Sequence, residues 1–181
     1  MLAWDTAILD WIGVHLYTPL LDSVMIFVTR LGDYGLPWVL LTLLLLAHKK
    51  TRGYGICMAA SLFLAFFISS MAIKPFVQRI RPFLEHEMNI LIPPPRGTSF
   101  PSSHATTSLA AATVIWCMNK RYGILAYLIA FLIAFSRLYL YVHYPSDVLT
   151  GCILGIAIGA ASVLVYRQAD KKGLLKKHRP D

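Results

Sequence analysis

Apolar residues fall into long runs along the chain, with short polar stretches between them. Two of the runs, 17–32 and 34–48, flank the turn-like sequence Gly32-Asp33-Tyr34-Gly35. The others cover 54–73, 102–118, 122–138 and 147–166. Because one helical membrane crossing needs about 20 residues, the first two runs are borderline alone. We predict that they form a hairpin of spans.

The stretch 4–16 has a different pattern. Trp4 and Trp11 lie among aliphatic residues, with Asp5, Asp10 and His15 between them. Flanking tryptophans are typical of an amphipathic helix in the membrane interface. The pattern therefore predicts an all-α fold: a six-helix transmembrane bundle with a short N-terminal interfacial helix. Residues 1–181 would make one domain, ending in a basic tail at 167–181.

Composition supports the membrane assignment. Hydrophobic residues make up 57% of the 181 residues and charged residues 14%, and mean hydropathy is +0.60; soluble domains are nearer one quarter charged. The start of the chain lacks the basic region of a cleavable signal. The three cysteines lie in apolar runs without CxxC spacing, which favours buried thiols over a disulfide or metal site.

The net charge of +8 does not indicate nucleic-acid binding, because the basic residues form short clusters between apolar runs. Lys49-Lys50-Arg52, Lys120-Arg121 and the tail would share one side of a six-span layout, together with both termini. By the positive-inside rule that side is cytoplasmic. The loop 74–101 and the segment 137–143 would then face outward.

Two sequence features suggest how the spans pack and where chemistry lies. Gly151, Gly155 and Gly159 repeat every four residues, which favours close packing of the last span against another helix of the same chain. Just before that span, His143 and Asp147 are four residues apart, so on a helix they would share one face. The carboxylate would orient the imidazole as a nucleophile or base.

Two further polar stretches carry candidate site residues. Lys74 and Arg81 would suit a phosphate, although juxtamembrane cations also meet lipid headgroups. Ser102 and Ser103 open the fourth span at a helix N-terminus, where free amides favour an anion. His104 in that first turn is either a proton donor or a bystander in a serine cap.

Taken together, three blocks resemble the signature motifs of the type 2 phosphatidic acid phosphatase (PAP2) superfamily of membrane lipid phosphatases and soluble vanadium haloperoxidases. They are Lys74-x6-Arg81-Pro82, Pro101-Ser102-Ser103-His104 and Ser136-Arg137-x5-His143-x3-Asp147. The resemblance covers the third to sixth spans. Ser103 departs from it, because the family usually has glycine there.

The resemblance implies a role for each site residue. His143 would attack phosphorus to form a phosphohistidine, Asp147 would orient it, and His104 would act as general acid and then base. Lys74, Arg81, Ser102, Ser103 and Arg137 would bind the phosphoryl oxygens. No cofactor or metal is expected, since Glu85, His86 and Glu87 lie in a loop without a second ligand group.

These roles predict a metal-independent phosphatase. The short chain resembles the compact bacterial members of the family, which implies a bacterial cytoplasmic (inner) membrane, and the count of basic residues places the site on the periplasmic or exterior side. Candidate substrates are undecaprenyl diphosphate, phosphatidylglycerol phosphate, phosphatidic acid and lipid A 1-phosphate. The short chain slightly favours undecaprenyl diphosphate or a broad lipid-phosphate specificity. Beyond this substrate and membrane lipids, no obligate protein partner is evident. The alternatives are a lipid-phosphate carrier without turnover and a vanadate-dependent oxidase. Which lipid is used stays open.

Overall fold

The computed structural model describes residues 3–172, and every regular element among them is helical. The α-helices are α1 (Ala3–Leu16), α2 (Pro19–Gly32), α3 (Leu36–Ala47), α4 (Arg52–Phe66), α5 (Lys74–Val77), α6 (Pro82–Glu85), α7 (Ser103–Met118), α8 (Lys120–Tyr139) and α9 (Pro145–Lys171). A 3₁₀ turn, η1 (Asp33–Gly35), joins α2 to α3, and a π-helix, η2 (Phe67–Ile73), joins α4 to α5.

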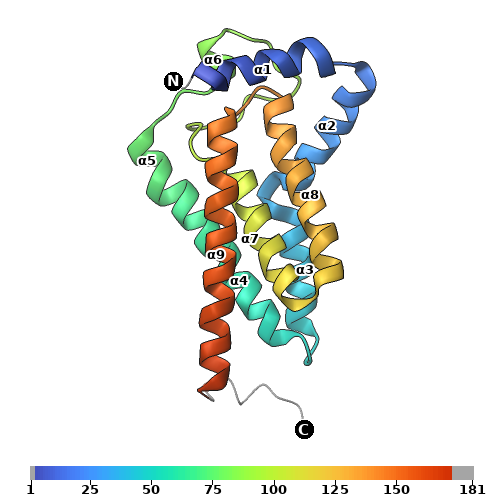
Figure 1. Cartoon of the computed structure of the whole chain (residues 1–181), viewed down its shortest axis with the longest axis vertical. Coiled ribbons are helices and arrows are strands. Elements are labelled where there is room, and N and C mark those ends of the chain that lie inside the picture. The colour runs from blue at the N-terminus through green and yellow to red at the C-terminus, as the bar shows by residue number, and fades with distance from the viewer. Residues whose placement is uncertain (1–2, 173–181) are drawn as a thin grey trace.

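The first helix lies across one end of the bundle, as Figure 1 shows, and the loop that contains α6 lies at the same end. The C-terminal end of α9 lies at the opposite end. This arrangement differs from the prediction that both termini share a side. Part of the predicted basic tail, 173–181, lies outside the described residues, and residues 167–171 extend α9.

The predicted hairpin at 17–48 is wrong. In Figure 1, α2 and α3 continue in the same direction through the bundle, and together Pro19–Ala47 make one apolar helical segment of 29 residues. Tyr34 (φ 55°) and Gly35 (φ 64°) adopt left-handed backbone conformations that break the helix. The intervening turn is only three residues long, and α3 continues in the direction of α2 after it, so the chain bends here but does not reverse.

Among the described residues, four helical segments are long and apolar enough to cross a membrane, which makes this a multi-pass membrane protein. They are Pro19–Ala47, Arg52–Glu85, Lys120–Tyr139 and Pro145–Lys171. The remaining predicted span is α7, whose 16 residues lie at the centre of the bundle between α4, α8 and α9.

Close packing of α9 against α7 confirms the role predicted for the glycine ridge. A Cβ atom on Gly155 would lie 2.4 Å from the carbonyl oxygen of Thr106, and one on Gly151 would lie 2.7 Å from that of Ser102. Only glycine therefore permits this approach. The contact brings the N-terminal ends of the two helices together, and both ends carry predicted site residues.

Candidate active site

The three polar stretches meet at the end of the bundle near α1. Arg81 Nη1 lies 3.2 Å from His143 Nε2 and donates a hydrogen bond to the carbonyl of Val142 at 2.9 Å. The amide of Ser102 donates to the carbonyl of Asp147 at 3.1 Å. The structure thus brings together the sequence blocks that lie up to 73 positions apart between Lys74 and Asp147.

His143 lies in the tight connection between α8 and α9, where its amide donates to the carbonyl of Arg137 at 3.3 Å. Its Nδ1 faces Asp147 Oδ2 at 3.4 Å, which is longer than a normal hydrogen bond. Burial, together with the cations Arg81, Arg137 and Lys74, holds the pKa of the His143 imidazole well below its usual range. The ring is therefore neutral at pH 7, as a nucleophile requires.

Asp147 is fully buried in the first turn of α9, where it accepts several hydrogen bonds. Its Oδ2 atom accepts from the hydroxyl of Ser99 and from the amide of Tyr144 (2.9 Å), and its Oδ1 atom accepts from Arg79 Nη1 (2.7 Å). The positive end of the α9 dipole adds to these contacts. The carboxylate is thus held in one position beside the His143 ring.

Arg79 connects that carboxylate to the N-terminal helix. Its Nη2 atom donates to Asp5 Oδ2 at 2.6 Å, and its guanidinium lies 4.0 Å from the centre of the Tyr144 ring. Asp5 is fully buried and also accepts from the amide (2.9 Å) and hydroxyl (2.7 Å) of Ser146. This network ties α1 to the start of α9.

The predicted phosphate-binding cations Lys74, Arg81 and Arg137 all lie close enough to the His143 ring to act on its charge. Lys74 Nζ donates to the carbonyl of Thr98 at 2.6 Å, and Arg137 Nη1 donates to the hydroxyl of Thr29. Ser102 Oγ and Arg137 Nε are both buried, yet neither has a hydrogen-bond partner within residues 3–172. Buried polar groups are seldom left unpaired, so these two atoms are free to bind an anion.

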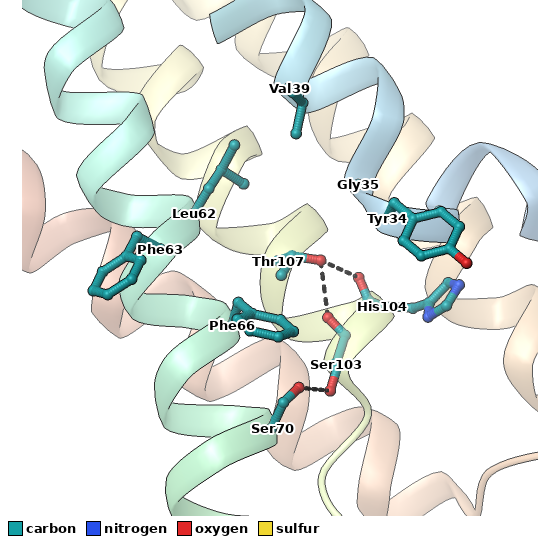
Figure 2. Close-up of a pocket in the computed structure, with 11 residues that line it drawn as sticks. Tyr34, Gly35, Val39, Leu62, Phe63, Phe66, Ser70, Ser103, His104 and Thr107 are labelled. Atoms are coloured by element: carbon teal, nitrogen blue, oxygen red, sulfur yellow. Dashed lines mark hydrogen bonds between the residues drawn. The ribbon is translucent and has the colours of Figure 1, made fainter. Parts of the chain in front are cut away.

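Ser103 and His104 border a cleft between η1, α3, α4 and α7, drawn in Figure 2. The cleft has a volume of about 410 Å³ and apolar walls that include Val39, Leu62 and Phe66. The Ser103 hydroxyl turns toward Ser70 (2.9 Å) and Ser69 (3.3 Å) on η2. Only its backbone amide, at the start of α7, is free to face a phosphate.

Within the described part of the chain, no group of three or more histidine, cysteine, aspartate or glutamate side chains is placed to hold a metal. Glu85 instead accepts a hydrogen bond from the Tyr144 hydroxyl, and the His86 ring packs edge-on against Tyr141. These residues stabilise the loop around α6.

Comparison with known proteins shows the family of the chain. The family model described as "PAP2 superfamily" matches residues 53–171. The chain belongs to the PAP2 superfamily. Like the relatives described next, it is a phosphatase.

Two relatives are named undecaprenyl-diphosphatases. BcrC of Bacillus subtilis is 31% identical over 162 residues, which are 87% of this chain and 80% of BcrC. The Sulfolobus acidocaldarius protein is 34% identical over 159 residues, covering 87% and 74% of the two chains. The crystal structure of the PAP2-type phosphatidylglycerolphosphate phosphatase from Bacillus subtilis superposes with a TM-score of 0.74 at 25% identity, covering 94% of this chain and 86% of the other.

Sequence reasoning missed four residues of this PAP2 site: Asp5, Asp33, Arg79 and Ser99. Arg79 lies inside the first motif, and its position two residues before Arg81 was the only available signal. The other three are short polar residues in a predicted interfacial helix, a turn and a loop. Nothing in their local sequence indicates a partner that is 48 to 141 positions away.

Proposed function

We propose that this phosphatase hydrolyses a lipid phosphate or lipid diphosphate at the outward face of a membrane, through a phosphohistidine on His143. The observation that carries the proposal is the pair of unpaired buried donors, Ser102 Oγ and Arg137 Nε. Arg81 lies 3.2 Å from His143 Nε2 in the same region. Such a group of donors around a neutral imidazole suits a phosphoryl group that is about to be attacked.

In the first step, His143 Nε2 attacks phosphorus and forms an N–P bond while the bond from phosphorus to the leaving oxygen breaks. His104 gives its proton to that oxygen, and the lipid alcohol or lipid monophosphate leaves. Asp147 accepts the hydrogen on His143 Nδ1 and keeps Nε2 directed at phosphorus. Lys74, Arg81 and Arg137, with Ser102 and the Ser103 amide, balance the phosphoryl charge.

In the second step, a water molecule attacks phosphorus and gives its proton to His104. The N–P bond breaks, inorganic phosphate leaves, and His143 returns to its neutral form. His104 thus acts as an acid and then as a base at the same position.

The cleft supports a lipid as the substrate. Its apolar walls begin at His104, so the part of the substrate beyond the leaving oxygen meets Leu62, Phe63 and Phe66. A hydrocarbon chain fits such walls. Undecaprenyl diphosphate is the first candidate because the two relatives described above are named undecaprenyl-diphosphatases. Phosphatidylglycerol phosphate is the second, because the similar crystal structure is that of a phosphatidylglycerolphosphate phosphatase. Phosphatidic acid and lipid A 1-phosphate complete the set.

The bundle supports five crossings by one domain: the broken segment α2–α3, the segment from α4 to α5, and α7, α8 and α9. The connection between α3 and α4, which carries Lys49 and Lys50, and the start of α8, which carries Lys120 and Arg121, belong to the end of the bundle opposite α1 and the site (Figure 1). By the positive-inside rule that end is cytoplasmic. The site and α1 then face outward from a bacterial cytoplasmic membrane.

The function is tested by phosphate release from a panel of the four lipids in detergent. Wild-type protein should release phosphate from at least one, and His143→Ala should not. Acid-labile phosphate trapped on wild-type protein but not on His143→Ala would exclude a carrier that binds without turnover. Wild-type release from His143→Ala would contradict the proposed mechanism.

Orientation is tested separately with single cysteines at Gly97, in the loop near the site, and at Lys49, at the other end. All three native cysteines are first replaced by serine. A membrane-impermeant maleimide added to whole cells should label the cysteine at position 97 and spare that at position 49. The reverse pattern would place the site in the cytoplasm.

A further inference from the structure

The break between α2 and α3 brings the carboxylate of Asp33 next to the imidazole of His104. Asp33 Oδ1, in η1, lies 3.1 Å from His104 Nε2, in the first turn of α7. An ionised carboxylate can only accept hydrogen bonds, so the shared hydrogen belongs to His104 Nε2. This contact joins residues 71 positions apart, and Asp33 lies outside the three sequence motifs.

Gly32, the residue before Asp33, has no side chain, and this allows the His104 ring to lie next to η1. A Cβ atom on Gly32 would lie 2.5 Å from His104 Cδ2 and 2.7 Å from Ile133 Cγ2. The imidazole therefore packs directly against the Gly32 backbone. Gly32 sets the position of the ring, and Asp33 sets its rotation.

The other ring nitrogen is left for chemistry. No hydrogen bond within residues 3–172 engages His104 Nδ1, and the ring borders the cleft, as Figure 2 shows. When one nitrogen of a histidine is fixed as a donor, the other carries the exchangeable proton or the lone pair. His104 Nδ1 is then the atom that protonates the leaving oxygen.

The charges around His104 explain why a carboxylate is needed. Burial above all, and then the cations Arg137 on α8 and Arg81 before α6, oppose the protonated form of the ring, and Asp33 is the carboxylate that favours that form. Arg30, on α2, also acts on Asp33. A general acid must carry its proton at the start of the reaction, in a site that is otherwise strongly positive.

We infer that Asp33 is the positioning residue for the general acid, forming with His104 a second carboxylate–histidine pair beside Asp147 and His143. This inference rests on the function proposed above. Asp33 touches neither the phosphoryl group nor the leaving oxygen. It holds the His104 ring in place and stabilises its charged form, so it acts on proton transfer alone.

The test compares two leaving groups. A lipid phosphomonoester releases an alkoxide that needs a proton, whereas p-nitrophenyl phosphate releases a nitrophenolate that does not. Asp33→Asn should lower kcat/KM for the lipid on the order of tenfold to a hundredfold, a part of the 10²–10⁴ that general acid catalysis supplies. For the nitrophenyl ester, kcat/KM should fall less than about threefold. The parameter kcat/KM reports only the steps up to phosphohistidine formation, so slower hydrolysis of the intermediate does not alter it.

Matched variants complete the design. Asp22→Asn removes the same charge from the preceding helix α2, where Asp22 accepts from the Tyr139 hydroxyl at 2.6 Å. It should leave the ratio of kcat/KM between the two substrates unchanged. Gly32→Ala, which displaces the ring, should shift the ratio in the same direction as Asp33→Asn.

Equal losses on both substrates in Asp33→Asn would show a merely structural role, and no loss on either would show none; both results overturn the inference. If His104→Ala is inactive on the lipid while Asp33→Asn is fully active, the inference fails and the proposed function stands. If His104→Ala and His143→Ala both keep wild-type activity, the proposed function fails and the inference fails with it.

Discussion

The two histidines of the site have very different surroundings. His143 is 2% exposed, and its partner Asp147 is fully buried and bonded to Arg79, Ser99 and the Tyr144 amide. The His104 side chain is 20% exposed and its partner Asp33 is 49% exposed, at the edge of the cleft. A nucleophile needs one fixed geometry, whereas the acid must meet first a lipid leaving group and then water.

The largest expected effect is at the nucleophile. His143→Ala should lower kcat/KM by about 10⁴-fold or more on both lipid and nitrophenyl phosphate, because without a nucleophile the leaving group is irrelevant. Phosphate release measures it. His86→Ala, which alters a histidine of the nearby loop, should keep near-wild-type rates. If His143→Ala lost activity on the lipid but kept it on nitrophenyl phosphate, His143 would act on the leaving group, as we propose for His104, and not as the nucleophile.

The next largest effect is expected at Arg137, whose charge acts on both histidines. Arg137→Lys keeps the charge but loses the planar fork, and should lower kcat on the order of 10²-fold on both substrates, as the loss of a charge-stabilising donor does. Thermal unfolding in detergent should show that the variant is folded. Full activity with lysine would remove Arg137 Nε from the anion site.

Arg79→Gln tests the network behind the nucleophile. Asp147 would lose its 2.7 Å partner and α1 its contact through Asp5. We expect a fall in kcat on the order of tenfold to a hundredfold, by analogy with partners that orient a catalytic or metal-binding histidine. The fall should be equal on both substrates.

The control for that network is Arg96→Gln, the same change at an exposed side chain, which should retain activity. A larger loss on the lipid than on the nitrophenyl ester in Arg79→Gln would show that Arg79 supports the general acid His104, and would contradict its assignment to the surroundings of His143.

The smallest effect concerns pH and stability. The folded protein keeps His143 neutral below the usual imidazole pKa of about 6.5, whereas the unfolded chain takes up a proton there. Stability from this group is therefore complete above about pH 6.5 and declines as the pH falls below it. The unfolding temperature in detergent should drop from pH 7 to pH 5, and His143→Asn should drop less. Equal slopes would show that the imidazole is not desolvated.

The three motif blocks could be predicted from the sequence because their chemistry is local. Lys74 and Arg81, Ser102 to His104, and Arg137 to Asp147 each combine charge with a helix end or proline, and charge near a membrane marks function. The bounds of α7 and α8 and the start of α9 followed to within about two residues from long apolar runs that end at polar residues, whereas α9 continues to Lys171, past its predicted end at 166.

The hairpin prediction failed for a physical reason. Gly32-Asp33-Tyr34-Gly35 has the composition of a reversing turn, yet a kink uses the same left-handed residues at Tyr34 and Gly35. Which of the two forms depends on whether α2 finds its partner in α3 or in α8, and α2 packs against α8. Local sequence contains no record of that choice.

The sequence by itself determined the candidate catalytic groups and the membrane setting, because residue type and hydrophobic run length act over a few positions. Only the tertiary structure decided the pairings between residues far apart in the sequence. Asp33 reaches His104 through the bend in one segment, and Arg79 links Asp5 to Asp147 through the packing of α1 across the bundle. Such pairings depend on the sum of many helix contacts, and a single polar residue in a turn or an interfacial helix does not reveal them.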